Sequence, residues 1–580
     1  TPAVLQQKNI RLVFDGLDTD ADIWLNNQHL GHVQNMFRRW AMDVKKIIRL
    51  QNNLLQIRFR SAITVSNELA ARYLPVRLPD HPRTHLRKAA YQFGWDWGPT
   101  LTGCGIWKPV WLEAFTERSR QEQEEAINER NYRNWVPEIQ LNLEKDSIGG
   151  RFQFEANGKP VYMKGVNWVP VNLYPGTASK ADYRRLLLQV RDANMNMIRV
   201  WGGGIYEDDA FYDLCDSLHL YVWQDLMFAG AMVPGNDSFF TNVKAELAYQ
   251  VNRLRHHPCI VLWCGNNEID EAWHNWGWQQ SFQLHGTDSA TVWQDYRRLF
   301  EDSIRRWLHT WDPKRSYIST SPRFGWGRNQ SYTEGDSHFW GLWWGLQDWE
   351  VFRQKTGRFV SEFGMQSMPH PAVWGNDQLT VTDTRIQSHQ KASQGNMKLE
   401  YYLQRYFMDS TRFHQLNLEQ YSYLTQCLQA YILQNALAVQ LLAAPRNQGS
   451  LIWQLNDVWP SISWSLIDFS GRPKAAWYAV RRMFAENARL TTDPLIPRNW
   501  PYPTVQLSIR RLTATDILIE ADQPAWFVEL YVPGKNITWS DNFFHLRAGE
   551  QKRIRLQKGN ITAELLQQIR YRVLNQLYHE

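Results

Sequence analysis

The sequence predicts a multidomain protein of the β plus α/β class, and three changes of pattern along its 580 residues carry that prediction. Residues 10–114 alternate apolar and polar side chains, as antiparallel strands with one solvated face do. From Val161 onward, short apolar runs alternate with helical periodicity, which is the pattern of a parallel sheet covered by helices. Beyond Arg482 the helical pattern gives way to alternating sequence again, so we expect three folded parts.

The first part, residues 1–115, is predicted to be a jelly-roll-like β-sandwich. Its candidate strands span residues 11–16, 21–27 and 54–59. Near its end, residues 91–99 form a dense aromatic cluster in which Asp96 lies between Trp95 and Trp97. The cluster is either a turn packed on the sandwich or a loop that presents Asp96 to the hydroxyl groups of a ligand.

The longest part, residues 151–485, is predicted to be a (β/α)8 TIM barrel. Ser179 and Asp182 have the spacing of a capping box. Two helical faces follow, formed by Tyr183, Leu186, Leu187 and Val190, and by Phe211, Leu214, Cys215 and Leu218. The candidate strands are residues 161–168, 197–201, 220–225, 260–265, 316–320, 337–340, 358–361 and 450–454. Eight parallel strands with right-handed crossovers close a barrel.

The segments around the barrel are simpler in pattern. Residues 116–150 are rich in charge and poor in apolar side chains, which favours a linker. Residues 486–580 contain two alternating stretches, 505–509 and 526–532, and are predicted to form a small C-terminal β-sandwich-like domain. The stretch 428–444 is apolar but interrupted by Gln and Asn, so we expect an amphipathic helix and not a membrane span.

Composition and charge narrow the possible functions. The 64 Lys and Arg against 58 Asp and Glu give a net charge of only +6. No basic run with interleaved aromatic residues occurs, so nucleic-acid binding is not expected. The 30 Trp either pack a large core or stack on sugar rings. The five Cys are scattered and odd in number, which favours a reducing compartment, cytoplasmic over periplasmic or lysosomal. No secretory signal pattern begins the chain.

Two glutamates end apolar strands of the predicted barrel. Glu268 follows residues 260–265 and two asparagines, and Glu362 follows residues 358–361. Because the carboxyl ends of barrel strands share one face, the two carboxylates are expected to oppose each other across the mouth. An acid half desolvated by indole and thiol groups can hold a proton near neutral pH. Hydrolysis of a glycosidic bond with retention requires two such carboxyl groups, about 5–5.5 Å apart.

A structural interpretation is the alternative, because paired glutamates at strand ends also occur as salt-bridged groups. Three neighbours favour catalysis. Asn267 can hydrogen-bond the hydroxyl group beside the reacting carbon of a sugar, and Arg199 can hold Glu362 ionised. Trp453, at the end of the last candidate strand, can form the floor of a sugar site.

Six motifs resemble the signatures of β-mannosidases in glycoside hydrolase family 2. They are WDWGP at residues 95–99, RVWGGGIYE at 199–207, WCGNNE at 263–268, GDSHFW at 335–340, VSEFGMQ at 360–366 and WQLND at 453–457. The matches extend from Ile10 to Ala485, and together they are specific. The Asn267 and Glu268 pair alone would indicate only the wider clan of barrel glycosidases.

The resemblance implies an exo-acting, retaining enzyme for β-mannosides or manno-oligosaccharides, with Glu268 as acid/base and Glu362 as nucleophile. It implies that the sandwich is sugar-binding in type and that Asp96 reaches from it into the barrel mouth. The residues implied to bind substrate are Asp96, Trp97, Arg199, Trp201, Asn267, His338 and Trp453. No cofactor and no metal are implied. Family members have an immunoglobulin-like domain between sandwich and barrel, so residues 116–150 are expected to be its remnant in a chain shortened outside the barrel.

Other chemistries have weaker support in the sequence. The spacing of His256, His257, Cys259 and Cys264 matches no common zinc pattern, and the glycines 202–204 lack the context of a phosphate loop. Neither G-x-S-x-G nor H-E-x-x-H occurs. Two alternatives stay open: another exo-glycosidase of the same family, acting on galactosides or glucuronides, and a carbohydrate-binding protein without turnover. The sequence does not indicate an oligomeric state.

Overall fold

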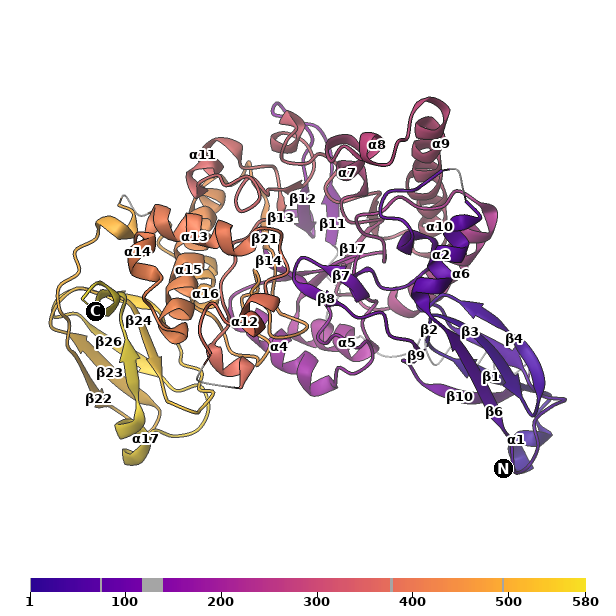
Figure 1. Ribbon diagram of the computed structural model, residues 1–580, viewed down its shortest axis with the longest axis horizontal. Coiled ribbons are helices and arrows are strands. Elements are labelled where there is room, and N and C mark those ends of the chain that lie inside the picture. The colour runs from indigo at the N-terminus through magenta and orange to yellow at the C-terminus, as the bar shows by residue number, and fades with distance from the viewer. Residues whose placement is uncertain (1, 74–75, 117–138, 376–378, 493–494, 580) are drawn as a thin grey trace.

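The computed structural model describes residues 2–73, 76–116, 139–375, 379–492 and 495–579. A β-sandwich, a barrel and a second β domain follow one another along the chain, with the barrel between the two β domains (Figure 1). Most of the predicted linker, residues 117–138, lies outside the described residues.

The N-terminal sandwich consists of two three-stranded antiparallel sheets. One has the order β10-β1-β5, with β10 (Val110–Phe115), β1 (Asn9–Phe14) and β5 (Trp40–Asp43). The other has the order β4-β3-β6, with β4 (Gln28–Gln34), β3 (Asp20–Leu25) and β6 (Leu55–Arg60). Their buried side chains meet in one core that includes Ile10, Leu12, Phe14, Ala21, Ile23 and Val33. The alternation along these strands therefore forms a sandwich, as the sequence predicts.

A short hairpin connects this sandwich to the barrel. Its strands are β7 (Phe93–Trp95) and β8 (Gly98–Thr100), and Trp95 pairs with Gly98, so Asp96 and Trp97 form the turn. The indole N–H of Trp459 and the Ser461 hydroxyl group, both from the barrel, donate to Trp97 O over 2.9 and 3.0 Å. The tip of the hairpin is thus attached to the barrel.

The barrel is a curled sheet of eight parallel strands in the order β18-β17-β16-β15-β14-β21-β20-β19. Their bounds are β14 (Met163–Trp168), β15 (Met197–Val200), β16 (Tyr221–Asp225), β17 (Ile260–Cys264), β18 (Ser316–Ile318), β19 (Ser337–His338), β20 (Val360–Glu362) and β21 (Gly449–Ile452). The Ser321 hydroxyl group, after β18, donates to Asp336 Oδ2, before β19, over 2.6 Å and connects the two end strands. The predicted TIM barrel is confirmed.

Helices follow the barrel strands on the outside of the sheet, as in other parallel barrels. They include α4 (Lys180–Asp192), α5 (Asp209–Leu218), α6 (Asp237–Leu254), α7 (Ile269–Asn275), α9 (Gly286–Tyr296), α10 (Ile304–Trp311), α11 (Phe352–Lys355), α13 (Gly395–Tyr406) and α16 (Ala475–Phe484). Ser179 and Asp182 form the predicted capping box of α4, and all four side chains of its predicted apolar face are buried. In α5, Phe211 and Cys215 are buried, while Leu214 and Leu218 are partly exposed.

The predicted amphipathic helix is instead buried on nearly every side. It is α15 (Leu418–Leu442), which lies between the barrel and the C-terminal domain (Figure 1). Gln429, one of the residues that interrupt the apolar stretch, donates to Met365 O over 2.9 Å, and the Tyr423 hydroxyl group donates to Phe527 O over 2.6 Å. Buried polar groups need such partners, so the polar residues of this helix bind neighbouring backbone. In the described parts of the chain, no helix combines the length and apolar character of a membrane span.

A small antiparallel sheet closes the barrel at the amino ends of its strands. It contains β11 (Ile139–Asn142), β12 (Gln153–Ala156) and β13 (Lys159–Val161). The ring of Phe152, just before β12, lies 5.5 Å from that of Trp223 and 5.0 Å from that of Phe359. The other end of the barrel, where the strands finish, remains open to a cavity.

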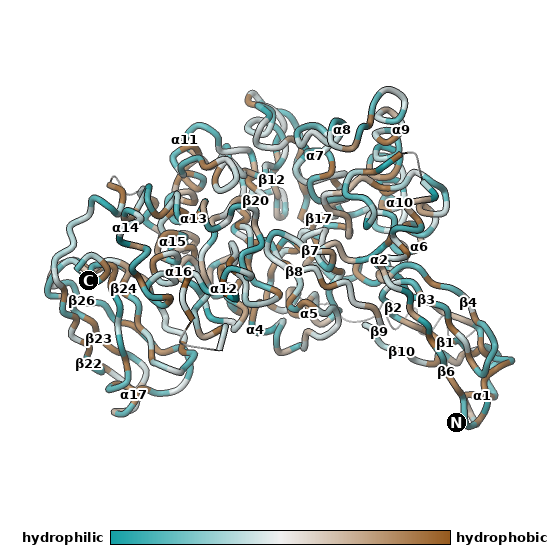
Figure 2. Tube along the Cα trace, in the orientation of Figure 1, coloured by the Kyte–Doolittle hydropathy of each residue, from teal (hydrophilic) through white to brown (hydrophobic). Residues whose placement is uncertain are grey.

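The C-terminal domain again has two antiparallel sheets. One contains β22 (Leu507–Arg511), β23 (Asp516–Ala521) and β26 (Gln551–Arg555), and the other β24 (Ala525–Tyr531), β25 (Phe544–Leu546) and β27 (Arg570–Arg572). Their shared core includes Ile517, Ile519, Val528, Leu530, Trp539 and Ile554. Polar and apolar residues alternate along such strands in both β domains (Figure 2).

Candidate active site

Glu268 and Glu362 lie together at the open end of the barrel. Glu268 is the N-cap of α7, four residues after the end of β17, and Glu362 is the last residue of β20. Carboxylate oxygens of the two residues lie within 4.8 Å of one another. Glu268 has a φ of 62°, which non-glycine residues seldom adopt, and its N–H donates to Ser321 O over 2.8 Å. The backbone after β17 is therefore turned so that this carboxyl group enters the cavity.

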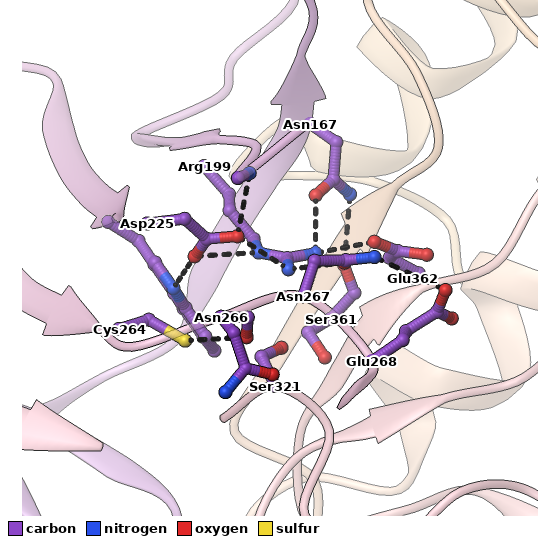
Figure 3. A network of polar contacts seen from close by, with 12 residues as sticks. Asn167, Arg199, Asp225, Cys264, Asn266, Asn267, Glu268, Ser321, Ser361 and Glu362 are labelled. Atoms are coloured by element: carbon purple, nitrogen blue, oxygen red, sulfur yellow. Dashed lines mark hydrogen bonds and ion pairs between the residues drawn. The ribbon is translucent and has the colours of Figure 1, made fainter. Parts of the chain in front are cut away.

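Arg199 organises the polar groups beneath the two glutamates. Its Nη1 donates to Glu362 Oε1 over 2.5 Å, and its Nη2 donates to Asp225 Oδ2 and to Asn267 Oδ1, each over 2.8 Å (Figure 3). The guanidinium group is fully buried, so these bonds are little screened by water. One cation thus orients both the carboxylate of Glu362 and the amide of Asn267.

His338 and Trp340 complete the surroundings of the two carboxylates. His338 Nδ1 lies 2.9 Å from Glu268 Oε1 and 3.2 Å from Glu362 Oε2, so the ring bridges the pair. The Trp340 indole N–H donates to Glu362 Oε2 over 3.2 Å. Burial lowers the pKa of His338 to about 4, so the imidazole is neutral at neutral pH.

The pKa of each glutamate is raised to about 7, chiefly by burial. The charge of Glu271 adds to this effect at Glu268, and the charge of Glu268 adds to it at Glu362. Their hydrogen-bond donors differ. Glu362 accepts from the charged Arg199 and from Trp340, whereas Glu268 accepts from Asn267 Nδ2 over 3.2 Å and lies 2.9 Å from His338 Nδ1, both of which are neutral groups. Because a charged donor stabilises a carboxylate more than a neutral one does, this arrangement favours Glu362 as the ionised group and Glu268 as the protonated one.

A cavity of about 450 Å³ opens above the two glutamates. Its lining residues are Trp95, Asp96, Trp201, Asn267, Glu268, Glu271, Trp276, Trp326, His338, Trp340, Trp344, Glu362 and Trp453. Indole faces and a few convergent polar groups are the chemistry of a sugar site. The Trp201 ring lies 5.5 Å from that of Trp453 and 4.8 Å from that of Trp95, so three of these indoles form one continuous wall.

Asp96 enters this cavity from the sandwich domain. Within the described residues, its buried Oδ1 has no hydrogen-bond partner. Burial raises the pKa of Asp96 to about 8, and the charges of Glu268 and Glu362 contribute to the increase. Such a buried and unpaired oxygen is costly unless a ligand meets it. The alternative that residues 91–99 are only a packed turn is therefore not supported by the geometry.

Two of the residues expected to bind substrate do not line the cavity. The Trp97 side chain is fully buried and lies edge-on against Trp201, with ring centres 5.6 Å apart. It supports the wall, and Trp95 on the other side of Asp96 lines the cavity instead. Arg199 is covered by the groups that it binds and positions them without reaching the cavity.

Sequence reasoning missed several indoles and one carboxylate of the cavity. Trp340 lies two residues after His338, in a motif that was identified, so its place after a barrel strand was a usable signal. Glu271, Trp276, Trp326 and Trp344 come from long loops or short helices beyond the strands. These segments have no periodicity from which the direction of a side chain could be predicted.

Two clusters in the described parts of the chain contain donor types that metals accept. Glu268, His338 and Glu362 form one, and Asp216, His257 and Cys259 form the other. In the second, His257 Nδ1 lies 2.7 Å from Asp216 Oδ2, and Cys259 N donates to Asp216 Oδ1 over 2.8 Å. Asp216 is thus already used in structural bonds between α5 and the start of β17. Cys264 lies apart, with its thiol 3.4 Å from Asn266 O.

A parallel barrel whose fourth and seventh strands lead to two opposed glutamates defines a glycoside hydrolase. Residues 1–108 match the family model described as glycosyl hydrolase 2 galactose-binding domain-like, and residues 500–577 match a mannosidase Ig-fold domain. The β-mannosidase B of Aspergillus niger is 31% identical, with 83% of this chain and 68% of that protein covered. The β-mannosidase of Rattus norvegicus is 29% identical, with 84% and 68% covered. The chain belongs to the β-mannosidases of glycoside hydrolase family 2.

Solved structures agree with this assignment. The β-D-mannosidase of Dictyoglomus thermophilum superimposes with a TM-score of 0.86 and 25% identity, over 99% of this chain and 91% of that one. An exo-chitosanase from Amycolatopsis orientalis shares the fold at a TM-score of 0.59 and 12% identity, covering 98% and 89%.

Proposed function

We propose that this protein is an exo-acting, retaining β-mannosidase that releases terminal β-D-mannose from the non-reducing end of β-mannosides and manno-oligosaccharides. The single observation that carries the mechanism is the pair Glu268 and Glu362, whose oxygens lie within 4.8 Å. Retaining enzymes hold their two carboxyl groups about 5–5.5 Å apart, whereas inverting enzymes hold them roughly 6.5–9.5 Å apart to leave room for a water, so oxygens this near to each other favour retention.

In the first step, Glu362 attacks the anomeric carbon while the bond from that carbon to the leaving oxygen breaks. Glu268 transfers its proton to the leaving oxygen, so no free alkoxide is released. Arg199 and Trp340 hold Glu362 ionised and aimed at the reacting carbon. The products of this step are the free alcohol and a mannosyl ester of Glu362.

In the second step, a water molecule takes the place of the departed alcohol. Glu268, now ionised, removes a proton from this water as its oxygen attacks the anomeric carbon, and Glu362 leaves as a carboxylate. Two inversions at the same carbon give net retention. Asn267, held by Arg199, faces the same cavity and is placed to hydrogen-bond the neighbouring sugar hydroxyl group.

The hairpin of the sandwich supports an exo mode of action. Its turn residue Asp96 lies in the wall of the cavity, and Trp97 O is attached to the loop after β21. A wall that the sandwich adds to one side of the cavity is what we expect of an enzyme that acts on the end of a chain. Asp96 is then available to the hydroxyl groups of the terminal mannose.

The two raised pKa values predict a bell-shaped dependence of kcat/KM on pH. Activity should fall at acid pH, where Glu362 is protonated, and again at alkaline pH, where Glu268 is ionised. Because the pKa of each is about 7, the optimum should lie near neutral pH and the bell should be narrow. Hydrolysis of an aryl β-mannoside from about pH 4 to about pH 10 measures this profile, and a flat profile would contradict the assignment.

A panel of aryl glycosides tests the proposed function directly. The protein should hydrolyse the β-mannoside in preference to the β-glucoside, β-galactoside and β-glucuronide. Asp96→Ala should lower kcat/KM for the mannoside by about 10- to 100-fold, since a hydrogen bond between this buried carboxyl group and a sugar hydroxyl group is lost. Asp96→Asn, which keeps an acceptor oxygen, should lose less. Preference for another glycoside would favour a different family 2 activity, and binding without turnover would favour a carbohydrate-binding protein.

A further inference from the structure

Asp225 shares Arg199 with the nucleophile, although its own side chain does not line the cavity. It is the last residue of β16 and is fully buried. Its Oδ2 accepts from Arg199 Nη2 over 2.8 Å and its Oδ1 from Arg199 Nε over 3.3 Å, whereas Glu362 accepts from Nη1 (Figure 3). The two carboxylates thus lie on opposite sides of one guanidinium group.

Two further donors hold the Asp225 carboxylate in place. The Trp223 indole N–H donates to Oδ1 over 2.9 Å, and the Gly202 N–H donates to Oδ2 over 3.0 Å. Burial raises the pKa of Asp225, but Arg199 and these two donors oppose the rise and favour the ionised form. Burial also acts to lower the pKa of Arg199, but the charge of Asp225, followed by that of Glu362, raises it above its usual value. Asp225 is therefore a firmly bound counter-charge of Arg199.

The covalent mechanism removes the charge of only one of these two carboxylates. When Glu362 attacks the anomeric carbon, its negative charge is consumed in the new bond, and the electrons of the broken bond leave with the departing oxygen, which takes the proton of Glu268. Glu362 is then a neutral ester, while Arg199 remains charged and buried. Glu268, now ionised, is separated from Arg199 by the Asn267 amide, which binds both. Because a buried cation without a paired anion is strongly destabilising, Arg199 needs a second carboxylate at this stage.

We propose that Asp225 is a positioning residue that holds Arg199 and balances its charge while Glu362 is esterified. The inference rests on the proposed function and concerns the same site. With Asp225 present, Arg199 binds two carboxylates in the free enzyme and one in the mannosyl-enzyme. Without Asp225, it binds one in the free enzyme and none in the mannosyl-enzyme. Loss of this charge therefore makes Glu362 a poorer nucleophile in the first step and a better leaving group in the second.

Asp225→Asn tests this role in each chemical step separately. A 2-deoxy-2-fluoro-β-mannosyl fluoride forms an ester with Glu362 that is hydrolysed slowly, so inactivation reports the first step and recovery after removal of the reagent reports the second. In Asp225→Asn, inactivation should be slower by about tenfold or more, while recovery should be faster by about threefold or more. A defect of packing alone would slow both steps, so slower or unchanged recovery would overturn the inference.

Asn167→Ala is the matched control. Asn167 Oδ1 accepts from the same guanidinium group, at Nη1 over 3.1 Å, but carries no charge. Its loss should not speed recovery, and recovery as fast as that of Asp225→Asn would contradict a role for charge. An unmodified protein that the fluoride does not inactivate would overturn the proposed function and with it this inference. If the unmodified protein is inactivated and Asp225→Asn shows the same two rates, only this inference fails.

Melting temperatures give a second measurement that does not depend on turnover. Asp225→Asn and Glu362→Ala each leave Arg199 one bound carboxylate, whereas the double variant leaves it none. The melting temperature of the double variant should therefore fall by more than the sum of the two single effects. Additive effects would contradict the proposal that either carboxylate can balance the charge of Arg199.

Discussion

Glu362→Ala is expected to lower kcat/KM for an aryl β-mannoside by about 10⁴-fold or more, because no mannosyl ester can form without this carboxylate. The fold should survive the change. Arg199 keeps its bond to Asp225, so no buried guanidinium is left without a counter-charge. The melting temperature of the variant, measured beside the activity, separates loss of chemistry from loss of structure.

Rescue by a small anion makes this prediction specific to a nucleophile. Azide can enter the space left by the Glu362 side chain and attack the anomeric carbon directly, while Glu268 still protonates the leaving oxygen. One inversion then gives an α-mannosyl azide. Glu564→Ala, on an exposed face of the C-terminal domain, is a suitable control that should keep full activity. Substantial hydrolysis by Glu362→Ala without an added nucleophile would remove the assignment.

Glu268→Ala should have an effect that depends on the leaving group. For mannobiose, whose leaving oxygen needs a proton, kcat/KM should fall by about 10²- to 10⁴-fold. A dinitrophenyl mannoside leaves without protonation, so its first step should be nearly intact. The second step should then be slow because no base activates water. We therefore expect a burst of dinitrophenol release followed by a low steady rate.

The stereochemistry of rescue distinguishes this variant from the first. Azide attacking the mannosyl ester of Glu362 should give a β-mannosyl azide, since the carbon has then been inverted twice. The alkaline limb of the pH profile should also disappear, because the group that titrates there is absent. A uniform loss on both leaving groups would show that Glu268 acts otherwise than as the acid.

The sequence predicts the barrel and its two glutamates because both depend on local patterns. A buried strand is an apolar run, and a polar residue that ends such a run faces the common end of the barrel. This is why Glu268, Glu362 and Asn267 could be located without a structure. The capping box at Ser179 and Asp182 was equally local, and it is present.

The sequence could not predict features that depend on packing between distant segments. Trp95 and Trp97 are separated by one residue, and only the two-residue turn of the hairpin decides which of them faces the cavity. The burial of α15 depends on the C-terminal domain, from which Phe527 O accepts the Tyr423 hydroxyl group. Glu271 belongs to a helix of seven residues whose place in the cavity wall depends on the loop that contains Gly325.

Because of the hairpin that carries Asp96, residues of two domains line the active-site cavity. The reacting carboxylates belong to the barrel, whereas Asp96, the group proposed to recognise the sugar, belongs to the sandwich. An ion pair attaches this part of the chain to the barrel: Arg87 Nη2 lies 2.7 Å from Oε1 of Glu246 in α6. In the proposed function the sugar is contacted from both domains, by Asp96 of the sandwich and by Asn267 of the barrel, and the charges of Glu268 and Glu362 act on Asp96. A change in how the two domains pack would therefore alter sugar recognition and catalysis together.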